Sequence, residues 1–331
     1  VIKYSLRPVL FAYLASVVLP VNFLESTKRL KIAFILLMAT GVAVALDGFL
    51  SLFVGGGGLY RAHPLPWFGF YPIGDNHNVL AEWLLFTAPV TLALSTLLAS
   101  ERMKRYAYYV AAFMIAITLL TFARSAWIVF IIEVVFLGAT IWHPWVLRSA
   151  KQILIGLIGF SPLAVYMAFF SSQEGVQSST DARAMLAGIA WELFRESPLL
   201  GVGAGTFVDH VSKTWIFTYE FGAALDSHGY LQKLAAETGL LGLLAFAGVV
   251  AILAWHLYLT WKILRDRQLW EQRLFAYLCA GVLGAFIYQI FNTTYWTPKL
   301  WLPVGIALAA SQILVRRTQP SSQQALSPLE T

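Results

Sequence analysis

Residues 239–262 read GLLGLLAFAGVVAILAWHLYLTWK, with no acidic residue and a single lysine at the end. An α-helix rises 1.5 Å per residue, so a stretch of this length crosses the roughly 30 Å hydrocarbon layer of a bilayer. A helix also satisfies its own backbone hydrogen bonds inside that layer, where no water is available. The stretch therefore predicts a transmembrane helix.

The same pattern recurs along the chain. The composition is 59% hydrophobic and 12% charged, with a mean hydropathy of +0.69, which is too apolar for a soluble domain. Nine membrane spans are predicted, at 8–24, 32–54, 78–99, 106–123, 125–142, 152–171, 239–262, 274–292 and 300–315. We therefore expect an all-α polytopic membrane protein with spans one to six in residues 1–171 and spans seven to nine in residues 239–315.

Lysine and arginine are distributed unevenly between the loops. Fourteen of them fall in five short loops and eight on the other side of the membrane, and the rich loops are 25–31, 100–105, 143–151, 262–273 and 316–317. Short loops rich in basic residues face the cytoplasm. The net charge of +6 is thus an orientation signal, and it predicts no nucleic-acid partner. Residues 172–238 are placed on the outer side, and residues 316–331 form a polar cytoplasmic tail expected to be disordered.

Nine spans with a cytoplasmic C-terminus put the N-terminus outside, where Lys3 and Arg7 contradict the orientation rule. The chain also starts with Val1. We therefore expect an N-terminally shortened fragment that lacks an odd number of spans. The single cysteine, Cys279, lies inside a span, so neither a disulfide framework nor a cysteine-based metal site is predicted.

The outer loop 172–238 is predicted to contain two helices. The first covers 182–196 and ends before Ser197-Pro198, since the residue before proline disfavours the helical conformation. Its apolar residues form one stripe, made of Leu186, Ile189, Ala190, Leu193 and Phe194. Arg183 extends this stripe by one turn, so we expect its side chain to point toward the membrane bundle. A solvated arginine is the alternative.

The second helix is predicted at 228–238, capped by Asp226-Ser227 and ended by Gly239. Its inward face is expected to consist of Leu231, Leu234 and Ala235, with His228 on the same side in the first turn. The positive end of a helix dipole disfavours imidazolium, so His228 is expected to stay neutral and to accept a proton. A hydrogen-bonded structural histidine is the alternative.

Arg124 lies between spans four and five, which no long loop separates, so its guanidinium is placed at the outer membrane surface. An arginine there is costly unless it is paired or faces a wet cavity, which makes it a functional candidate. Glu133 lies nine residues deeper in the span, and the sequence names no partner for it.

Two further patterns carry less information. The glycines of Gly201–Gly205 would let backbone N–H groups approach a phosphate, but neither the strand nor the Lys-Ser/Thr of a nucleotide loop is present. A tight turn between helices is favoured. Asp75 and His77 supply only two metal ligands, so no metal site is predicted.

Arg124, Arg183 and His228 together combine two fixed cations with one neutral base. Paired arginines suit a diphosphate, and a neutral histidine suits removal of a proton from an attacking hydroxyl. This combination predicts metal-independent glycosyl transfer from a polyprenyl-diphosphate donor, with inversion at the anomeric carbon in a single displacement. Supporting polar groups are expected from Asp226, Asp75 and Glu237, of which Glu237 is expected to pair with Lys233 one turn away.

Three blocks of sequence resemble the O-antigen ligase and polymerase superfamily. They are LTFARSAW at 120–127, Arg183 with Trp191 and PLLGVG at 198–203, and HGYLQ at 228–232 with ETGLLG at 237–242. The resemblance runs from about Gly69 to Gly242, and the order and spacing of the blocks make it fairly specific.

The resemblance implies a polytopic enzyme of the bacterial inner membrane with a large periplasmic loop and about twelve spans. Such enzymes use undecaprenyl-diphosphate-linked glycans and need no metal or other cofactor. Arg124 and Arg183 match the family's diphosphate-binding arginines, and His228 matches its essential loop histidine. One departure is Gly229, where members usually have asparagine.

Three acceptors remain open. A ligase transfers the finished glycan to lipid A-core of lipopolysaccharide, a polymerase transfers it to another lipid-linked repeat, and a protein O-oligosaccharyltransferase transfers it to serine or threonine. The compact loop favours the ligase. A lipid-linked sugar transporter is the non-enzyme alternative, for which an internal repeat and polar groups near mid-membrane are expected. The ionisable residues instead concentrate at one face.

Overall fold

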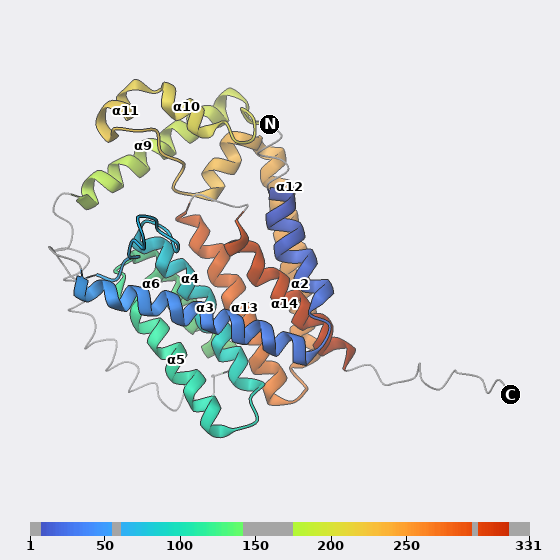
Figure 1. Ribbon diagram of the computed structural model, residues 1–331. Coiled ribbons are helices and arrows are strands. Elements are labelled where there is room, and N and C mark those ends of the chain that lie inside the picture. The colour runs from blue at the N-terminus through green and yellow to red at the C-terminus, as the bar shows by residue number, and fades with distance from the viewer. Residues whose placement is uncertain (1–7, 55–60, 142–174, 293–296, 318–331) are drawn as a thin grey trace.

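The computed structural model describes residues 8–54, 61–141, 175–292 and 297–317. Within these ranges every regular element is a helix, and the only extended pairing is one bridge between Trp67 and Phe70. Long helices form a bundle, and three others lie together above one end of it, at the top of Figure 1. The charge distribution predicts that this is the outer end. The chain is a multi-pass, all-α membrane protein.

Six described helices are long and apolar enough to cross a membrane: α3 (Thr27–Val54), α4 (His77–Thr96), α5 (Glu101–Leu120), α12 (Tyr230–Leu264), α13 (Leu269–Ile290) and α14 (Pro298–Arg316). The bundle also contains η1 (Pro8–Val18), α2 (Leu19–Phe23) and the 17-residue α6 (Arg124–Thr140). The predicted span 152–171 lies outside the described residues, so the total of nine spans stays a prediction.

Burial differs sharply between the spans. In the most apolar part of α4, 72% of the residues are buried inside the protein, against 6% in α12. The helices α3, α5 and α13 all pack against α4, which is therefore the centre of the bundle. It begins at His77 because the Asn76 side chain accepts hydrogen bonds from the N–H groups of Asn78 and Val79. The low burial of α12 leaves most of its surface for lipid.

The outer layer consists of α9 (Gly175–Glu196), α10 (Phe207–Lys213) and α11 (Trp215–Phe221). The predicted apolar stripe of α9 is confirmed, because Leu186, Ile189, Ala190 and Leu193 are buried against α10, α11 and the start of α12. The helix covers the predicted range 182–196 but begins earlier, at Gly175.

The second predicted helix differs from the observed one. Helix α12 begins at Tyr230 and continues through a kink at Gly239 (φ 64°, ψ −161°), so the predicted loop helix and the seventh span form one element. His228 consequently precedes the helix and does not lie in its first turn. The predicted inward face is also partly wrong, because Leu231 is 41% exposed while Lys233 is buried.

Candidate functional site

Arg124 stands at the first position of α6, directly after a strained turn. Phe122 adopts a left-handed backbone (φ 51°), which is costly for a residue other than glycine, and the Thr121 hydroxyl accepts a hydrogen bond from the N–H of Ala123. Ala123 has no side chain that could cap the helix. The first N–H groups of α6 and the exposed guanidinium of Arg124 therefore present positive charge at the same point, which is an arrangement that binds anions.

Arg183 of α9 is exposed, and Ala182 takes the buried position one turn before Leu186, so the prediction that Arg183 extends the buried stripe is wrong. The pKa of its guanidinium is lowered from its ordinary value, first by desolvation and then by the positive charge of Arg124. The loop arginine and the bundle arginine thus act on each other. The two residues lie 59 positions apart in the sequence, and the fold brings them to the same end of the molecule, as predicted.

His228 is half-buried just before α12. Its pKa is lowered from 6.5, first by desolvation and then by Arg183, while Asp226 opposes the shift. The imidazole is therefore neutral, as expected, but burial and Arg183 are the causes, because the residue is not part of the first helical turn. Gly229 follows it closely against α13, where a Cβ would lie 3.1 Å from the carbonyl oxygen of Ile290. This contact leaves little room for the asparagine that family members usually have.

An ion pair between the buried Lys233 and the partly exposed Asp226 holds the segment that carries His228. Both carboxylate oxygens of Asp226 accept hydrogen bonds from Lys233 Nζ at 2.7 Å, and one also accepts from the N–H of Ser227. Lys233 Nζ lies 3.9 Å from the carboxylate of Glu237, so the predicted Lys233–Glu237 pair is the longer and weaker of the two. Asp226 therefore fixes the loop through its ion pair with Lys233. It also lies close enough to His228 to raise the pKa of the imidazole.

The glycine-rich segment Gly201–Gly205 braces the start of α12. The N–H groups of Val202 and Gly203 donate to the carbonyl oxygens of Ala236 and Glu237 at 2.9 and 3.0 Å. Because these N–H groups are occupied by the helix, they are not available to a phosphate. The favoured prediction of a tight turn is confirmed.

Replacing Gly201 with alanine should destabilise the protein by more than about 2 kcal/mol. Gly201 has φ +71°, and a Cβ there would collide with the carbonyl carbon of Glu237. Gly188, in the middle of α9, has open space around it, so Gly188→Ala is the matched control and should stabilise by about 0.5–1 kcal/mol. Thermal unfolding of both variants in one detergent measures the difference. Equal midpoints would show that the close packing of Gly201 against the start of α12 does not stabilise the protein.

Tyr288 is a site residue that the sequence did not reveal. Its hydroxyl donates to the carbonyl oxygen of Asn78 at 2.7 Å and is hydrogen-bonded by the side chains of Ser125 and Asn292. The residue is 1% exposed and acts electrostatically on Arg183. It thus ties α4, α6 and α13 together beside Arg124. A tyrosine in an apolar span carries no sequence signal for such a contact.

The remaining predicted residues are dispersed. Asp75 is exposed and accepts a hydrogen bond from Asn76, whereas His77 interacts electrostatically with Arg61, Arg183 and His63. Within the described ranges no three potential metal ligands cluster. Glu133 is buried in α6 against Gly284, and its Oε1 has no hydrogen-bond partner among the described residues, so the expected polar partner is not found there.

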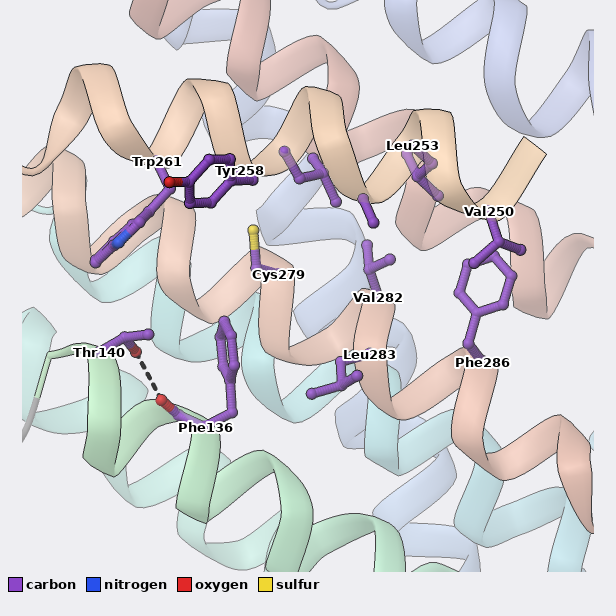
Figure 2. Close-up of a pocket in the computed structure, with 12 residues that line it drawn as sticks. Phe136, Thr140, Val250, Leu253, Tyr258, Trp261, Cys279, Val282, Leu283 and Phe286 are labelled. Atoms are coloured by element: carbon purple, nitrogen blue, oxygen red, sulfur yellow. Dashed lines mark hydrogen bonds between the residues drawn. The ribbon is translucent and has the colours of Figure 1, made fainter. Parts of the chain in front are cut away.

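An apolar groove lies between α6, α12 and α13, with a volume of about 370 Å³. Figure 2 shows Tyr258 and Trp261 at one end, Val250 and Phe286 at the other, and Cys279 between them. On α12 the end at Val250 is nearer to the kink at Gly239, and therefore nearer to the site.

Comparison with known proteins supports the resemblance. A family model described as O-antigen ligase matches residues 109–247, a stretch that contains Arg124, Arg183 and His228. The match begins later than Gly69 and ends close to Gly242. No curated protein sequence matches the chain. The match over residues 109–247, on a bundle of membrane helices, supports the similarity of this chain to the O-antigen ligase superfamily.

Proposed function

We propose that this protein is a metal-independent glycosyltransferase that moves O-antigen glycan from undecaprenyl diphosphate to a sugar hydroxyl of lipid A-core. The observation that carries the proposal is that Arg183 interacts electrostatically with both Arg124 and His228, which lie at the same end of the molecule. The match of residues 109–247 to the O-antigen ligase family model supports it. In this account the protein lies in the bacterial inner membrane and its site faces the periplasm.

The donor diphosphate lies between Arg124 and Arg183 at the uncapped start of α6. Each guanidinium offers forked hydrogen bonds to phosphate oxygens, and the helix end adds N–H donors. Desolvation and then the positive charge of Arg124 lower the pKa of Arg183, so the two arginines repel each other. A bound dianion relieves that repulsion, so binding is favoured without a metal ion.

The acceptor hydroxyl attacks the anomeric carbon while neutral His228 takes its proton. The bond from that carbon to the diphosphate oxygen breaks, and undecaprenyl diphosphate leaves with the electron pair. Arg124 and Arg183 stabilise the charge on the leaving group. The imidazolium formed at His228 is stabilised by Asp226, whose charge already favours the protonated form. A single displacement inverts the anomeric carbon.

The polyprenyl chain of the donor is assigned to the apolar groove of Figure 2. Its lining from α6, α12 and α13 is almost entirely hydrocarbon and aromatic, as a lipid chain requires. Its α6 wall belongs to the helix that carries Arg124 at its outer end. A lipid with its diphosphate at Arg124 can therefore extend along the same helix.

The pH dependence of transfer should follow His228. Because burial and Arg183 lower its pKa from 6.5, the neutral base persists below that pH, and kcat/KM should fall only at more acid pH. In the donor complex the diphosphate offsets the charge of Arg183, so the acid limb of kcat should lie at higher pH than that of kcat/KM. Rates measured from acid to neutral pH give both limbs. An acid limb of kcat/KM at or above 6.5 would exclude His228 as the base.

The function is tested by reconstituting the protein in lipid with an undecaprenyl-diphosphate oligosaccharide and lipid A-core, without added metal. Sugar on lipid A-core identifies the ligase. Longer chains that remain on the carrier identify a polymerase, and transfer to an added pilin-like protein identifies a protein O-oligosaccharyltransferase. Movement of the intact donor across the membrane without transfer would identify the transporter and overturn the proposal.

A further inference from the structure

A short aromatic hairpin lies between α3 and α4. Trp67 and Phe70 exchange backbone hydrogen bonds at 2.9 and 3.1 Å. The two residues between them, Phe68 (φ 52°) and Gly69 (φ 83°), both have the positive φ that the tightest hairpin turns require. Glycine adopts this backbone readily, whereas a bulky residue such as phenylalanine is strained in it. Strain of this kind points to a function for the Phe68 side chain.

The hairpin holds its aromatic side chains away from the protein. Phe68 is 95% exposed, Phe70 57% and the following Tyr71 50%. Trp67 is 44% exposed, and its indole N–H donates to the buried carboxylate of Asp47 at 2.6 Å. The position of the hairpin is thus fixed while its apolar surface stays uncovered. A patch of this kind marks an interaction surface.

Hydrogen bonds to two membrane helices set the level of the hairpin. Asp47, which accepts from the N–H of Leu65 and the indole of Trp67, lies seven residues before the end of α3, about 10 Å along that helix. The N–H of Ala62 donates to the carbonyl oxygen of Leu120, the last residue of α5, at 2.8 Å. The segment therefore lies beside those ends of α3 and α5 that are predicted to face outward, on the side of the outer layer (Figure 1).

The two helices that hold the hairpin are at the periphery of the bundle. In their most apolar parts only 33% of the residues of α3 and 28% of those of α5 are buried, against 72% in α4. Much of their surface is therefore left for lipid. The hairpin stands where this lipid-facing surface meets the membrane boundary.

The chemistry of the segment suits lipid headgroups. Tryptophan and tyrosine gather at the membrane interface, because their rings are apolar and their edges polar. Residues 61–74 contain one arginine and no acidic residue, so their charge suits lipid phosphates. A surface that binds glycan needs hydrogen-bonding groups beside its rings, and Phe68, Gly69 and Phe70 at the tip have no polar side chain.

We propose that the hairpin Trp67–Phe70 is a membrane anchor whose exposed aromatic side chains insert into the headgroup layer of the outer leaflet. Phe68, the most exposed of them, reaches into the layer from the tip. Ala62 is bonded to Leu120, and Leu120 lies only four residues before Arg124, so the anchor and the start of α6 share one level. The anchor thus fixes the height of Arg124 relative to the lipid phosphates, whatever chemistry Arg124 performs.

The test attaches a nitroxide spin label to position 68 through Phe68→Cys, after the only native cysteine has been removed by Cys279→Ala. The protein is reconstituted in vesicles of phosphatidylethanolamine and phosphatidylglycerol. Collisions of the label with O₂, which concentrates in the bilayer, are compared with collisions with a water-soluble nickel chelate. The ratio of the two rates should be severalfold higher at position 68 than at Tyr219→Cys, the matched control, because Tyr219 is an 82% exposed aromatic residue of α11 in the outer layer.

Two further labels complete the measurement. Ile252→Cys, at a 72% exposed position in the middle of α12, calibrates the ratio of the hydrocarbon layer. Phe70→Cys repeats the measurement with Phe68 left in place and should show the same preference for O₂.

A ratio like that of position 219 at either hairpin position would show that the hairpin lies in water and would overturn the anchor. Shielding from both reagents would show that protein, such as a second copy of the chain, covers it. Shielding that develops only when a lipid-linked oligosaccharide is added would show that the hairpin binds glycan. Either form of shielding would also overturn the proposal.

Discussion

Replacing His228 with alanine should lower kcat for glycan transfer by about 10³-fold and leave the KM for the lipid-linked donor nearly unchanged. The imidazole is assigned to the acceptor proton, whereas the arginines hold the diphosphate, so its loss removes an interaction made only in the transition state. The segment around it should survive the change, because Asp226, Ser227 and Lys233 fix its backbone without the imidazole.

His210→Ala is the matched control, since His210 lies in α10 of the same loop and has no assigned part in transfer. It should retain activity close to that of the unmodified protein. His228→Gln keeps a hydrogen-bonding side chain but cannot act as a base near neutral pH, so it should be as slow as alanine. Near-normal transfer by either His228 variant, in a folded and membrane-inserted protein, would show that another group takes the proton.

Replacing Arg183 with glutamine should lower kcat/KM for the donor by about 10²- to 10³-fold. The variant loses the contacts that the guanidinium makes to the diphosphate of the bound donor and to the diphosphate of the leaving group. Arg183→Lys keeps the charge but not the planar fork, so its kcat/KM should lie between that of the glutamine variant and that of the unmodified protein. Arg195→Gln supplies an exposed arginine from the same helix as the control.

The Arg183→Gln variant has a second, independent readout. Arg183 lowers the pKa of His228, so its removal should raise that pKa and move the acid limb of kcat/KM to higher pH. A role of Arg183 in folding alone would lower the amount of active protein without moving the limb. Unchanged donor affinity together with an unmoved limb would contradict the assignment.

Much of the fold could be predicted because apolar periodicity reflects burial directly. The stripe of α9 from Leu186 to Leu193 is such a pattern, and its residues are buried as predicted. The same periodicity predicts that Arg183 extends the stripe, but Ala182 takes that buried position and Arg183 is exposed. The cost of an arginine at the membrane surface drew attention to Arg124. These arguments use only local spacing, and they brought the three candidate residues to one end of the molecule.

The parts that could not be predicted depend on contacts between distant residues. The sequence predicts that Gly239 ends a helix, but its left-handed backbone forms a kink that the carbonyl of Leu199 approaches closely, and the helix continues. The spacing of four predicts a Lys233–Glu237 pair, but a loop residue, Asp226, approaches Lys233 more closely. Spacing along one helix cannot reveal a competing partner outside it.

Tyr288 could not be predicted for a related reason. It contacts Asn78, 210 positions away in the sequence. It stands in no motif, so only the folded chain places it near Arg124 and Arg183.

The most direct test of the central claim is a structure of the His228→Ala protein in lipid with an undecaprenyl-diphosphate oligosaccharide bound. The account predicts diphosphate oxygens within about 3 Å of the guanidinium nitrogens of both Arg124 and Arg183, with the anomeric carbon facing position 228. A diphosphate bound at any other place, with Arg124 and Arg183 both free of it, would contradict the account.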